Sequence, residues 1–557
     1  MSTPVLTAPI SADTRAQAFP VLTPEQIKRI RPSAKVRKVE KGEILFEPGD
    51  VDIPFYVLLS GGMDIVQPDV QGERMVTPHE PGEFTGEMTM ISGRGALVRG
   101  RVTAPGEFLE LNNAEFRSLV ARDADLNEIF MRAFIMRRVL LISSGLGNVI
   151  LLGSRHSAKT LRLREFLSRN GHPHTFVDLD TDKGTQELLD RFDVKLEEIP
   201  VVICNWRTVL RSPSNQEVAD CLGFNTGVVQ TQLRDLVVVG AGPSGLAAAV
   251  YGASEGLDVL VIESEAPGGQ AGSSSKIENY LGFPTGVSGL ELANRATTQA
   301  QKFGAKMMIS RSAARLSCKR RPFEVVLDDG TAIPARAVVI ASGAQYNKPD
   351  ISNLTQFEGQ GVYYGATFIE SQLCGNEDVI VVGGGNSAGQ AAVFMSQTAR
   401  KVHMLVRSGQ LSDTMSRYLI QRIEENPLID LHFNTEIVAL DGDTQLEQVT
   451  WQDKKTGDRS TNKIRHVFIM AGASPRTEWL RGCIALDNKG FILTGRDLDP
   501  LQAPVWPLAR APQMLETSLP GVFAVGDVRA GNVKRVASAV GEGSIAIHLV
   551  HRALAEL

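Results

Sequence analysis

Three spaced glycines and a later carboxylate form the first group of residues that could do chemistry. The glycine loop consists of Gly240, Ala241, Gly242, Pro243, Ser244 and Gly245. In this G-x-G-x-x-G spacing the first glycine permits a tight turn, the second lets a pyrophosphate approach the backbone, and the third lets a helix pack closely on a strand. Glu263 follows about 20 positions later, where a carboxylate accepts hydrogen bonds from ribose hydroxyls. The pattern predicts a dinucleotide site.

A second glycine-rich loop repeats this arrangement. Its predicted phosphate-binding residues are Gly383, Gly385, Asn386, Ser387 and Ala388. No carboxylate occupies the ribose position after this loop, because Val406 stands there and Arg407 follows it. A missing acid beside an arginine favours a 2′-phosphate, and therefore NADP over NAD. The alternative, that Arg407 is a solvated residue at the end of a strand, stays open.

Each loop needs a strand before it and a helix after it. Residues 236–239 and 379–382 have the composition of buried parallel strands, and a helix of small residues follows each loop. Further strands are expected at 259–262 and 401–406. Two such units predict two Rossmann-like domains for two dinucleotides, of which a bound flavin and a diffusible nicotinamide are the obvious pair. Hydride would then pass from one ring to the other.

From about residue 232 to 557 the chain resembles the thioredoxin-reductase branch of the pyridine nucleotide–disulfide oxidoreductases. The motifs that carry the resemblance are GGQ at 268–270, IENY at 277–280, ASGA at 341–344, AGASPRT at 471–477, GVFAVGD at 521–527 and KRVA at 534–537. The resemblance implies a homodimer with FAD and NADPH as cofactors. The implied FAD-binding domain spans 233–348 and 475–557, and the NAD(P)H-binding domain spans 350–470.

The resemblance also assigns roles to single residues. Besides the first loop and Glu263, the implied FAD contacts are Gly269, Gln270, Asn279, Ser342, Gly343, Gly526, Asp527, Arg535, Val536 and Ala537. Arg417 is a second implied NADPH contact, with a surface helix residue as the alternative.

The defining Cys-x-x-Cys of that family has no counterpart in this chain. The matching positions are Gly365 and Phe368, on either side of Ala366 and Thr367. The five cysteines are Cys204, Cys221, Cys318, Cys374 and Cys483. No two of them make a CxxC, which argues against a disulfide scaffold, a zinc site and a local redox dithiol. Cys374, the cysteine closest to the second loop in sequence, is expected to be a small buried hydrophobe.

Residues 20–140 resemble a cyclic-nucleotide-binding β-roll. The resemblance rests on KGEILFEPGD at 41–50 and PGEFTGE at 81–87. It implies that Glu87 holds the ribose 2′-hydroxyl. The arginine that would pair with the cyclic phosphate is replaced by Ala96, while Arg94 and Arg99 are out of register. A β-roll that binds a cyclic nucleotide and one that binds none both remain open.

Residues 147–224 resemble a thioredoxin or glutaredoxin fold, through a strand at 148–153 and the IPVV at 199–202. Pro200 is implied to be cis. The CxxC position reads SRHS at 154–157, so no thiol is present there. Ser154 and Arg155 could bind an anion at a helix N-terminus, or Ser154 could be an ordinary N-cap. Cys204 and Cys221 are expected to be packing residues.

Composition excludes several other classes. The 557 residues are 43% hydrophobic and 22% charged with a net charge of −5, and no basic tract suggests nucleic-acid binding. No apolar run approaches the roughly 18–20 residues that span a bilayer, and residues 1–20 lack the pattern of a signal peptide. We expect a soluble, cytoplasmic, multidomain protein: a β-roll, a thioredoxin-like domain and two α/β Rossmann-like domains that bind FAD and NADPH, with no metal site.

The expected function is that of an FAD-dependent NAD(P)H oxidoreductase. Hydride would pass from NADPH to FAD and then to an acceptor other than a local dithiol, such as a ferredoxin- or flavodoxin-like protein, a quinone or oxygen. Two alternatives remain open. One is a redox- or NADPH-sensing flavoprotein with degenerate sensor modules, and the other is the thioredoxin-disulfide reductase that the family name implies.

Overall fold

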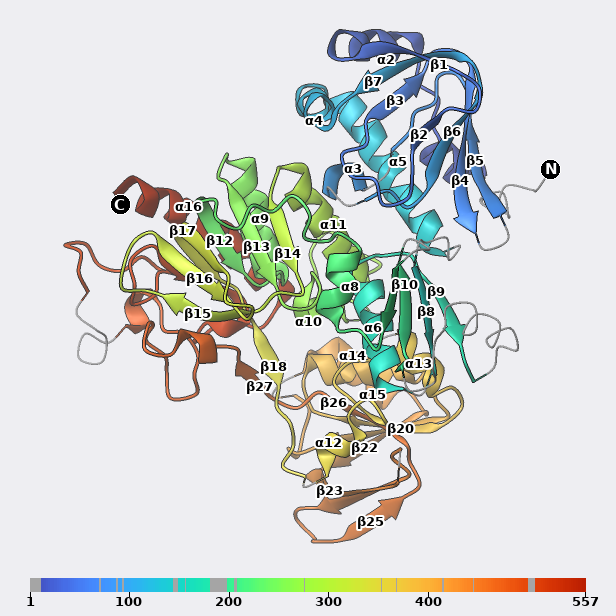
Figure 1. Cartoon of the computed structure of the whole chain (residues 1–557). Coiled ribbons are helices and arrows are strands. Elements are labelled where there is room, and N and C mark those ends of the chain that lie inside the picture. Colours follow the sequence, from blue (N-terminus) through green and yellow to red (C-terminus); the bar gives the residue numbers. More distant parts are fainter. Residues whose placement is uncertain are drawn as a thin grey trace. The chain divides into compact units, whose positions relative to one another are not determined.

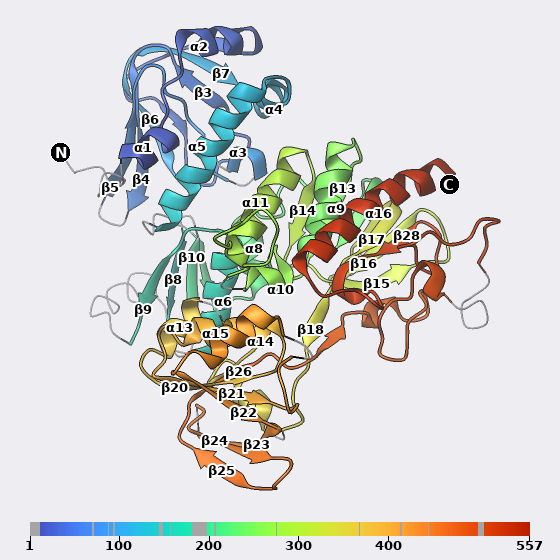
Figure 2. The ribbon, with the colours of Figure 1, turned by 180° about the vertical axis from the view of Figure 1, so that it is seen from behind.

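A computed structural model describes residues 12–556 except 70–71, 87–88, 93–94, 144–148, 156, 181–197, 205–207, 275, 352, 367, 413–414, 444 and 499–505. Figures 1 and 2 show the chain from opposite sides. The chain divides into two compact units, residues 1–155 with 166–228 and residues 156–165 with 229–557.

The first unit begins with a roll of two antiparallel sheets. One sheet is β1 (Lys35–Val39), β7 (Gly106–Leu111) and β3 (Phe55–Leu58), and the other is β2 (Ile44–Phe46), β6 (Arg99–Ala104), β4 (Gly62–Asp69) and β5 (Gly72–His79). Strand β3 is buried along its whole length. Tyr56 and Leu58 belong to the core that both sheets share, while Phe55 and Val57 pack against the helices. The helices that pack against Phe55 and Val57 are α2 (Pro24–Ile30), α3 (Thr89–Ser92), α4 (Asn113–Arg122) and α5 (Ala124–Ser143). Ala18 of α1 (Ala12–Ala18) packs in the core that both sheets share, and η2 (Arg31–Ser33) follows α2.

A four-stranded sheet follows, in the order β11-β10-β8-β9. Its elements are β8 (Val149–Gly153), α6 (Ala158–Arg169), β9 (Thr175–Asp178), β10 (Val201–Cys204), β11 (Thr208–Arg211) and α8 (Asn215–Cys221). Strands β8 and β9 are parallel, whereas β10 is antiparallel to both β8 and β11. The Ile199–Pro200 peptide is cis, as the sequence predicted. Assignment of this part to the thioredoxin fold stays a prediction.

The second unit contains a seven-stranded sheet. Its strands are β12 (Arg234–Val239), β13 (Val259–Glu263), β14 (Lys306–Ile309), β15 (Ala313–Ser317), β16 (Phe323–Leu327), β17 (Ala332–Ile340) and β28 (Val522–Ala524). Strands β14, β13, β12, β17 and β28 run parallel, and the β15–β16 hairpin joins β17 antiparallel. The helices are α9 (Pro243–Ser254), α10 (Gly269–Gly272), α11 (Gly289–Lys302) and α16 (Val536–Glu556). Helix α16 lies along α9 (Figure 2). The two helices are close at Gly543, where a Cβ would lie 2.2 Å from the Ser244 carbonyl oxygen.

A second parallel sheet has the order β19-β26-β20-β21-β22. Its strands are β19 (Val362–Tyr363), β20 (Asp378–Val382), β21 (Lys401–Val406), β22 (Ile429–Phe433) and β26 (His466–Ile469). Helices α12 (Leu354–Phe357), α13 (Phe368–Leu373), α14 (Asn386–Met395) and α15 (Arg417–Glu424) and an antiparallel sheet of β23 (Thr435–Asp441), β24 (Gln448–Asp453) and β25 (Arg459–Asn462) complete this part. Met404 packs with residues of α14 and α15 on one face, while Leu405 packs with Trp451 of β24 on the other.

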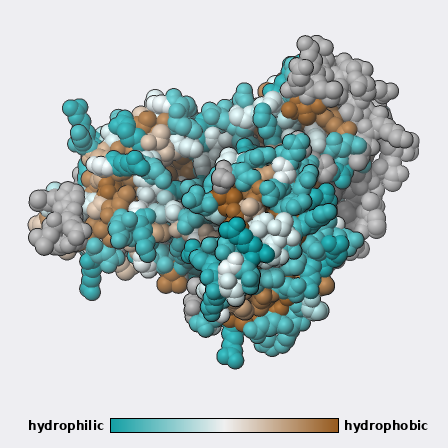
Figure 3. Space-filling view, turned by 90° about the horizontal axis from the view of Figure 1, so that it is seen from below, coloured by the Kyte–Doolittle hydropathy of each residue, from teal (hydrophilic) through white to brown (hydrophobic). Residues whose placement is uncertain are grey.

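Two short strands connect the two parallel sheets. Strand β18 (Ala344–Tyr346) pairs antiparallel with β27 (Ala473–Pro475). The remaining short helices are η4 (Glu478–Leu480), η5 (Gly495–Asp497) and η6 (Gly526–Val528). No helix in the described part of the chain is long and apolar enough to cross a membrane. On the face drawn in Figure 3, hydrophobic areas are separated by hydrophilic side chains.

Candidate active site

The first glycine loop joins β12 to α9 and combines close packing with open space. Gly240 has φ +105°, and a Cβ there would lie 2.3 Å from the Ala341 carbonyl oxygen. A Cβ on Gly245 would lie 1.9 Å from the Gly240 carbonyl oxygen. At Gly242, the N-cap of α9, a Cβ would meet no atom within 4 Å. The loop therefore fits a pyrophosphate beside Gly242, at the positive end of the helix dipole.

Glu263 ends β13 beside this loop. Its Oε2 accepts the Ala241 N–H at 2.7 Å, and its Oε1 accepts the Glu265 N–H at 2.9 Å. The residue is only 8% exposed. These hydrogen bonds hold the carboxylate against the loop, in the place where the sequence predicted a ribose-binding acid.

The carboxyl ends of three parallel strands meet at this edge of the sheet. The Ala341 N–H donates to the Val239 carbonyl at 2.8 Å, which joins the end of β17 to the end of β12. The Val525 N–H donates to the Ile340 carbonyl at 3.0 Å, which joins the end of β28 to β17. Ligands of open α/β sheets bind outside the carboxyl ends of the strands, so this edge is the candidate site.

Further predicted residues lie along the same edge. Ser342 Oγ–H donates to the Arg476 carbonyl at 2.8 Å, and a Cβ on Gly526 would lie 2.5 Å from Ser244 Oγ. Gly343 has φ +67° and open space at its Cβ position. The structure thus brings residues of the loop, of the β17 end and of the β28 end together, although they are far apart in sequence.

Gln270 also reaches this edge. A Cβ on Gly269 would lie 3.0 Å from the Gly242 Cα, which places the start of α10 against the glycine loop. Gln270 Nε2–H donates to the Ala344 carbonyl. The amide of Gln270 is therefore held beside Gly343.

Asp527 is a half-buried acid in η6, which follows β28. Burial raises its pKa, the nearby Lys534 lowers it, and Glu542 raises it. Among the described residues the Asp527 carboxylate makes no side-chain hydrogen bond. A carboxylate accepts hydrogen bonds, so this group fits a ligand that donates hydroxyl hydrogens. Such donors are found on the ribityl chain of a flavin.

Four predicted FAD contacts are exposed or half-buried residues. Asn279 is exposed, and within the described chain it makes no hydrogen bond. Arg535 and Ala537 are exposed and Val536 is half-buried, at the start of α16.

The second glycine loop joins β20 to α14. Gly383 has φ +143°, and a Cβ there would lie 2.7 Å from the Met470 carbonyl oxygen. Gly385 is the N-cap of α14, and Ala388 is fully buried in that helix. Asn386 Oδ1 accepts the Ser416 N–H at 2.8 Å and the Ser416 hydroxyl at 2.6 Å. This amide attaches the start of α15 to the loop.

Two arginines near this loop have free guanidinium groups. Arg407 follows β21, whose Leu405 carbonyl accepts the Gly383 N–H at 3.0 Å. Arg417 begins α15, directly after Ser416. Both side chains are exposed, and in the part of the chain that the structure describes neither makes a hydrogen bond or an ion pair. Unpaired cations beside a helix N-terminus suit a phosphate.

Sequence reasoning missed Tyr346. This residue ends β18, and its hydroxyl lies near Ser387 of the second loop. Burial raises the pKa of Tyr346, the neighbouring Ser387 lowers it, and the negative charge of Asp527 raises it further. Tyr346 therefore lies between residues of the two predicted cofactor sites. The only sequence signal was its position just after the ASGA motif.

No cysteine is present at the two positions where the resemblance implies a dithiol. Gly365 has open space at its Cβ position. Phe368 begins α13, but its side chain and Thr367 lie outside what the structure describes. Cys374 follows α13 and is fully buried, as predicted, and burial raises the pKa of its thiol. A buried thiol with a raised pKa is a poor nucleophile because thiolate is the reactive form.

The cysteine pattern argued against a disulfide scaffold, and the structure contains a single disulfide between distant cysteines. Cys318 and Cys483 are bonded, across a sequence separation of 165 residues. They join the segment after β15 to the segment after η4. Cysteine spacing along the chain could not reveal this pair because the fold brings its members together.

Reduction of the Cys318–Cys483 bond is expected to lower the free energy of unfolding by about 2–4 kcal/mol, because the crosslink restricts the unfolded chain. Urea unfolding with and without dithiothreitol measures this. A Cys318→Ser/Cys483→Ser double variant is the control, since dithiothreitol should leave its unfolding unchanged. Non-reducing peptide mapping that finds both thiols free would contradict the assignment.

Cys204 and Cys221 also lie together. Cys204 ends β10, is fully buried and hydrogen-bonds with the Cys221 thiol at the end of α8. This hydrogen bond and burial raise the pKa of Cys204 and lower its reactivity. The expectation that Cys204 is a packing residue agrees with its burial.

The expectations for Ser154 and Arg155 need correction. Helix α6 begins at Ala158, so Ser154 is not its N-cap, and the Ser154 hydroxyl donates to Asp180 at 2.7 Å. Ser157 occupies the capping position instead, and its Oγ accepts the Thr160 N–H at 3.5 Å. Arg155 forms an ion pair with Asp178. A carboxylate already neutralises that cation, which leaves little attraction for an external anion.

In the β-roll, Glu87 and Arg94 lie outside the described residues. Ala96 is buried in the core. Arg99 donates from Nε to Glu47 at 2.8 Å and also pairs with Glu73. Arg99 therefore offers no free charge to a cyclic phosphate.

Comparison with known proteins identifies the second unit. Residues 234–543 match the family described as pyridine nucleotide-disulphide oxidoreductase. The chain belongs to this family. Residues 36–123 match the cyclic nucleotide-binding domain. The family membership makes the chain an NAD(P)H-dependent flavoprotein oxidoreductase with FAD and NADPH as cofactors.

Similar proteins include bacterial thioredoxin reductases. That of Mycoplasmopsis pulmonis is 32% identical over 318 residues, which are 57% of this chain and 96% of the relative. That of Bacillus subtilis is 31% identical over 329 residues, 59% of this chain and 97% of the relative. The solved Lactococcus lactis thioredoxin reductase superposes with a TM-score of 0.52 at 25% identity, over 58% of this chain and all of that one.

Proposed function

We propose that this chain passes electrons from NADPH through FAD to an acceptor without using a dithiol of its own. The observation that carries the proposal is Gly365, which stands with open space around it where the family has a cysteine. The acceptor would be a ferredoxin- or flavodoxin-like protein, a quinone or oxygen. When bound, FAD supplies the chemistry that accepts hydride and releases electrons.

The residues of the first site would bind and orient the flavin nucleotide. The N-terminus of α9 would hold the pyrophosphate beside Gly242, and Glu263 would accept hydrogen bonds from ribose hydroxyls. Asp527 would accept hydrogen bonds from the ribityl chain. Gln270, held at the Ala344 carbonyl, would lie close to the ring.

At the second site the N-terminus of α14 would hold the pyrophosphate of NADPH. Arg407 would pair with the 2′-phosphate, and Arg417 would add a second charge. The Tyr346 hydroxyl, which lies near Ser387, would help to position the two sites relative to each other. We assign residues 350–470 to this NADPH-binding domain, and residues 233–348 with 475–557 to the FAD-binding domain.

A regulatory flavoprotein is the second candidate. The first unit contains a cyclic nucleotide-binding domain in which Arg99 is already paired with acids, and a thioredoxin-like sheet without a CxxC. These two modules keep their folds but lack residues that the usual phosphate binding and dithiol chemistry require. This combination favours a role in sensing. A third candidate, reduction of thioredoxin, follows only from the names of the relatives.

A Cys204→Ala/Cys221→Ala/Cys374→Ala variant is expected to oxidise NADPH with ferricyanide or a quinone at the wild-type rate, because no thiol carries the electrons. This variant keeps the Cys318–Cys483 bond, so its fold is preserved. A variant in which all five cysteines are replaced extends the test to the Cys318–Cys483 pair. Thioredoxin reduction that is robust in the wild type and lost in either variant would overturn the proposal.

A Gly365→Cys/Phe368→Cys variant is the matched gain-of-function control, because the open space at Gly365 admits a side chain. Its reduction by NADPH should consume extra reducing equivalents for the new disulfide. If no artificial acceptor supports turnover in the wild type while NADPH still bleaches the flavin, the result would favour the regulatory flavoprotein over the enzyme.

A further inference from the structure

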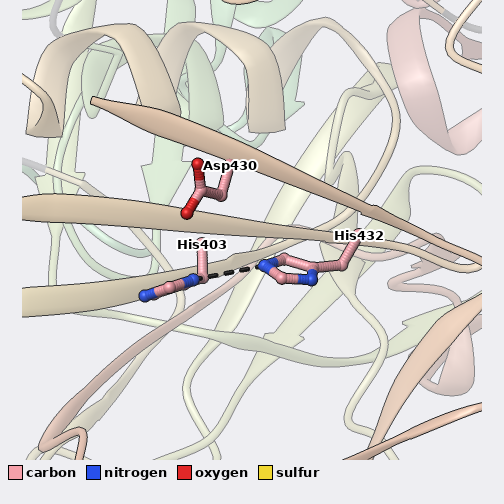
Figure 4. Close-up of side chains that lie close together, drawn as sticks. All are labelled: His403, Asp430 and His432. Atoms are coloured by element: carbon pink, nitrogen blue, oxygen red, sulfur yellow. Dashed lines mark hydrogen bonds between the residues drawn. The ribbon is translucent and has the colours of Figure 1, made fainter. Parts of the chain in front are cut away.

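Two histidines and an aspartate meet on one face of the second parallel sheet. His403 lies on β21, while Asp430 and His432 lie on the neighbouring strand β22. The register places His403 opposite Asp430. Figure 4 shows the two imidazole rings next to each other, with the carboxylate beside them. The sequence analysis did not identify these three residues as a site. His403 is far from Asp430 and His432 along the chain, and only the pairing of β21 with β22 brings them together.

The distances suit a small cation. His403 Nδ1 and His432 Nε2 are 3.2 Å apart, and one ligand atom from each of the three residues lies within 4.8 Å of the others. Two imidazole nitrogens bound to a tetrahedral zinc ion at 2.0–2.1 Å would be separated by about 3.3 Å. We propose that His403, Asp430 and His432 form a binding site for a divalent first-row transition metal of the zinc type.

A hydrogen bond now joins His403 Nδ1 to His432 Nε2. A metal ligand must be unprotonated at the nitrogen that binds the ion, so the proton of this hydrogen bond would move to the far nitrogen of its own ring.

The surroundings hold the ligands in place and tune their charge. Trp451 of β24 packs against both rings, with centroid distances of 5.6 Å to His403 and 5.4 Å to His432. Lys401 donates to Asp430 Oδ1 at 3.0 Å and is the competing cation. Asp378, itself paired with Arg400, adds negative charge near His403. All three ligands are half-buried, so a fourth ligand could come from solvent.

The site is separate from the second glycine loop. His403 alternates with Val402 and Met404, which pack in the core with the helices α14 and α15. The imidazole therefore belongs to the opposite face, which the sheet of β23, β24 and β25 covers. A metal there would join β21 to β22, and it should stabilise this part without taking part in hydride transfer.

The test uses the whole flavoprotein after treatment with a chelator. Titration with Co²⁺ should give saturable binding of one ion, with the visible absorption bands of a four-coordinate site, and Zn²⁺ should displace it and raise the melting temperature. His403→Gln and His432→Gln should each weaken Co²⁺ binding more than about tenfold, since even outer partners of a metal ligand are worth about that much. Lys401→Met should tighten it.

His551→Gln is the matched control, because His551 is a half-exposed histidine that pairs with an acid elsewhere. Its Co²⁺ affinity should equal that of the wild type. Flavin content and NADPH-dependent bleaching verify that each variant is folded, and neither should change. Absence of saturable Co²⁺ binding to the wild type, or equal binding by His403→Gln or His432→Gln, would overturn the proposal.

Discussion

A Gly242→Ala variant is expected to fold but to retain little FAD after purification. Alanine is accommodated in the protein itself, because a Cβ at this position meets no atom within 4 Å and the backbone has φ −69°. The same methyl group would occupy the space that a pyrophosphate needs beside the helix N-terminus. We expect FAD affinity to fall by at least about tenfold, which corresponds to 1.4 kcal/mol. Flavin absorbance per protein and titration of the apoprotein with FAD measure the change.

Variants of two other glycines serve as controls for this experiment. Gly245→Ala should also lose FAD, but with a lower melting temperature, since its Cβ would lie 1.9 Å from the Gly240 carbonyl oxygen. Gly541→Ala should change neither property, because the added Cβ meets nothing within 4 Å. A Gly242→Ala protein that stays as yellow as the wild type would refute the assignment of this loop.

Arg407→Ala is expected to remove most of the preference for NADPH over NADH. A charged contact to the 2′-phosphate is worth roughly 1.5–3 kcal/mol, or about ten- to a hundredfold in affinity. The guanidinium makes no other described contact, so its loss should cost little stability. Stopped-flow bleaching of the flavin with each nucleotide measures the affinities, and the affinity for NADH should hardly change.

Arg400→Ala is the matched control for this experiment. Arg400 is an exposed arginine of the same domain, but it pairs with Asp378 at 2.8 Å. Its removal should leave both nucleotide affinities unchanged, while Arg417→Ala should have a smaller effect than Arg407→Ala. Equal affinity of the wild type for NADH and NADPH would eliminate the proposed role of Arg407.

Local patterns predicted the parts of the site whose geometry is local. The glycine spacing required a strand before and a helix after each loop, and β12–α9 and β20–α14 are those units. Glu263 was recognisable because its distance from the loop is set by the length of one helix and one strand. Arg407 was recognisable for the same reason, as the residue after β21.

Long-range contacts could not be predicted in the same way. The Cys318–Cys483 disulfide joins positions 165 residues apart, so the spacing of the cysteines could not reveal it. Arg155 was expected to be able to bind an anion, but Asp178 pairs with it across the fold. A charge is free or neutralised according to its neighbours in space, and these neighbours come from other strands.

The two nucleotide-binding units and the loss of the CxxC could be predicted from the order of the residues, because these features depend on residues that are adjacent or one helix apart. The proximity of Tyr346 to Ser387 and of His403 to His432 could not be predicted in this way. Each of those pairs depends on which strands lie side by side and which face each side chain takes. That arrangement is set by the packing of the whole sheet, and no short stretch of sequence contains it.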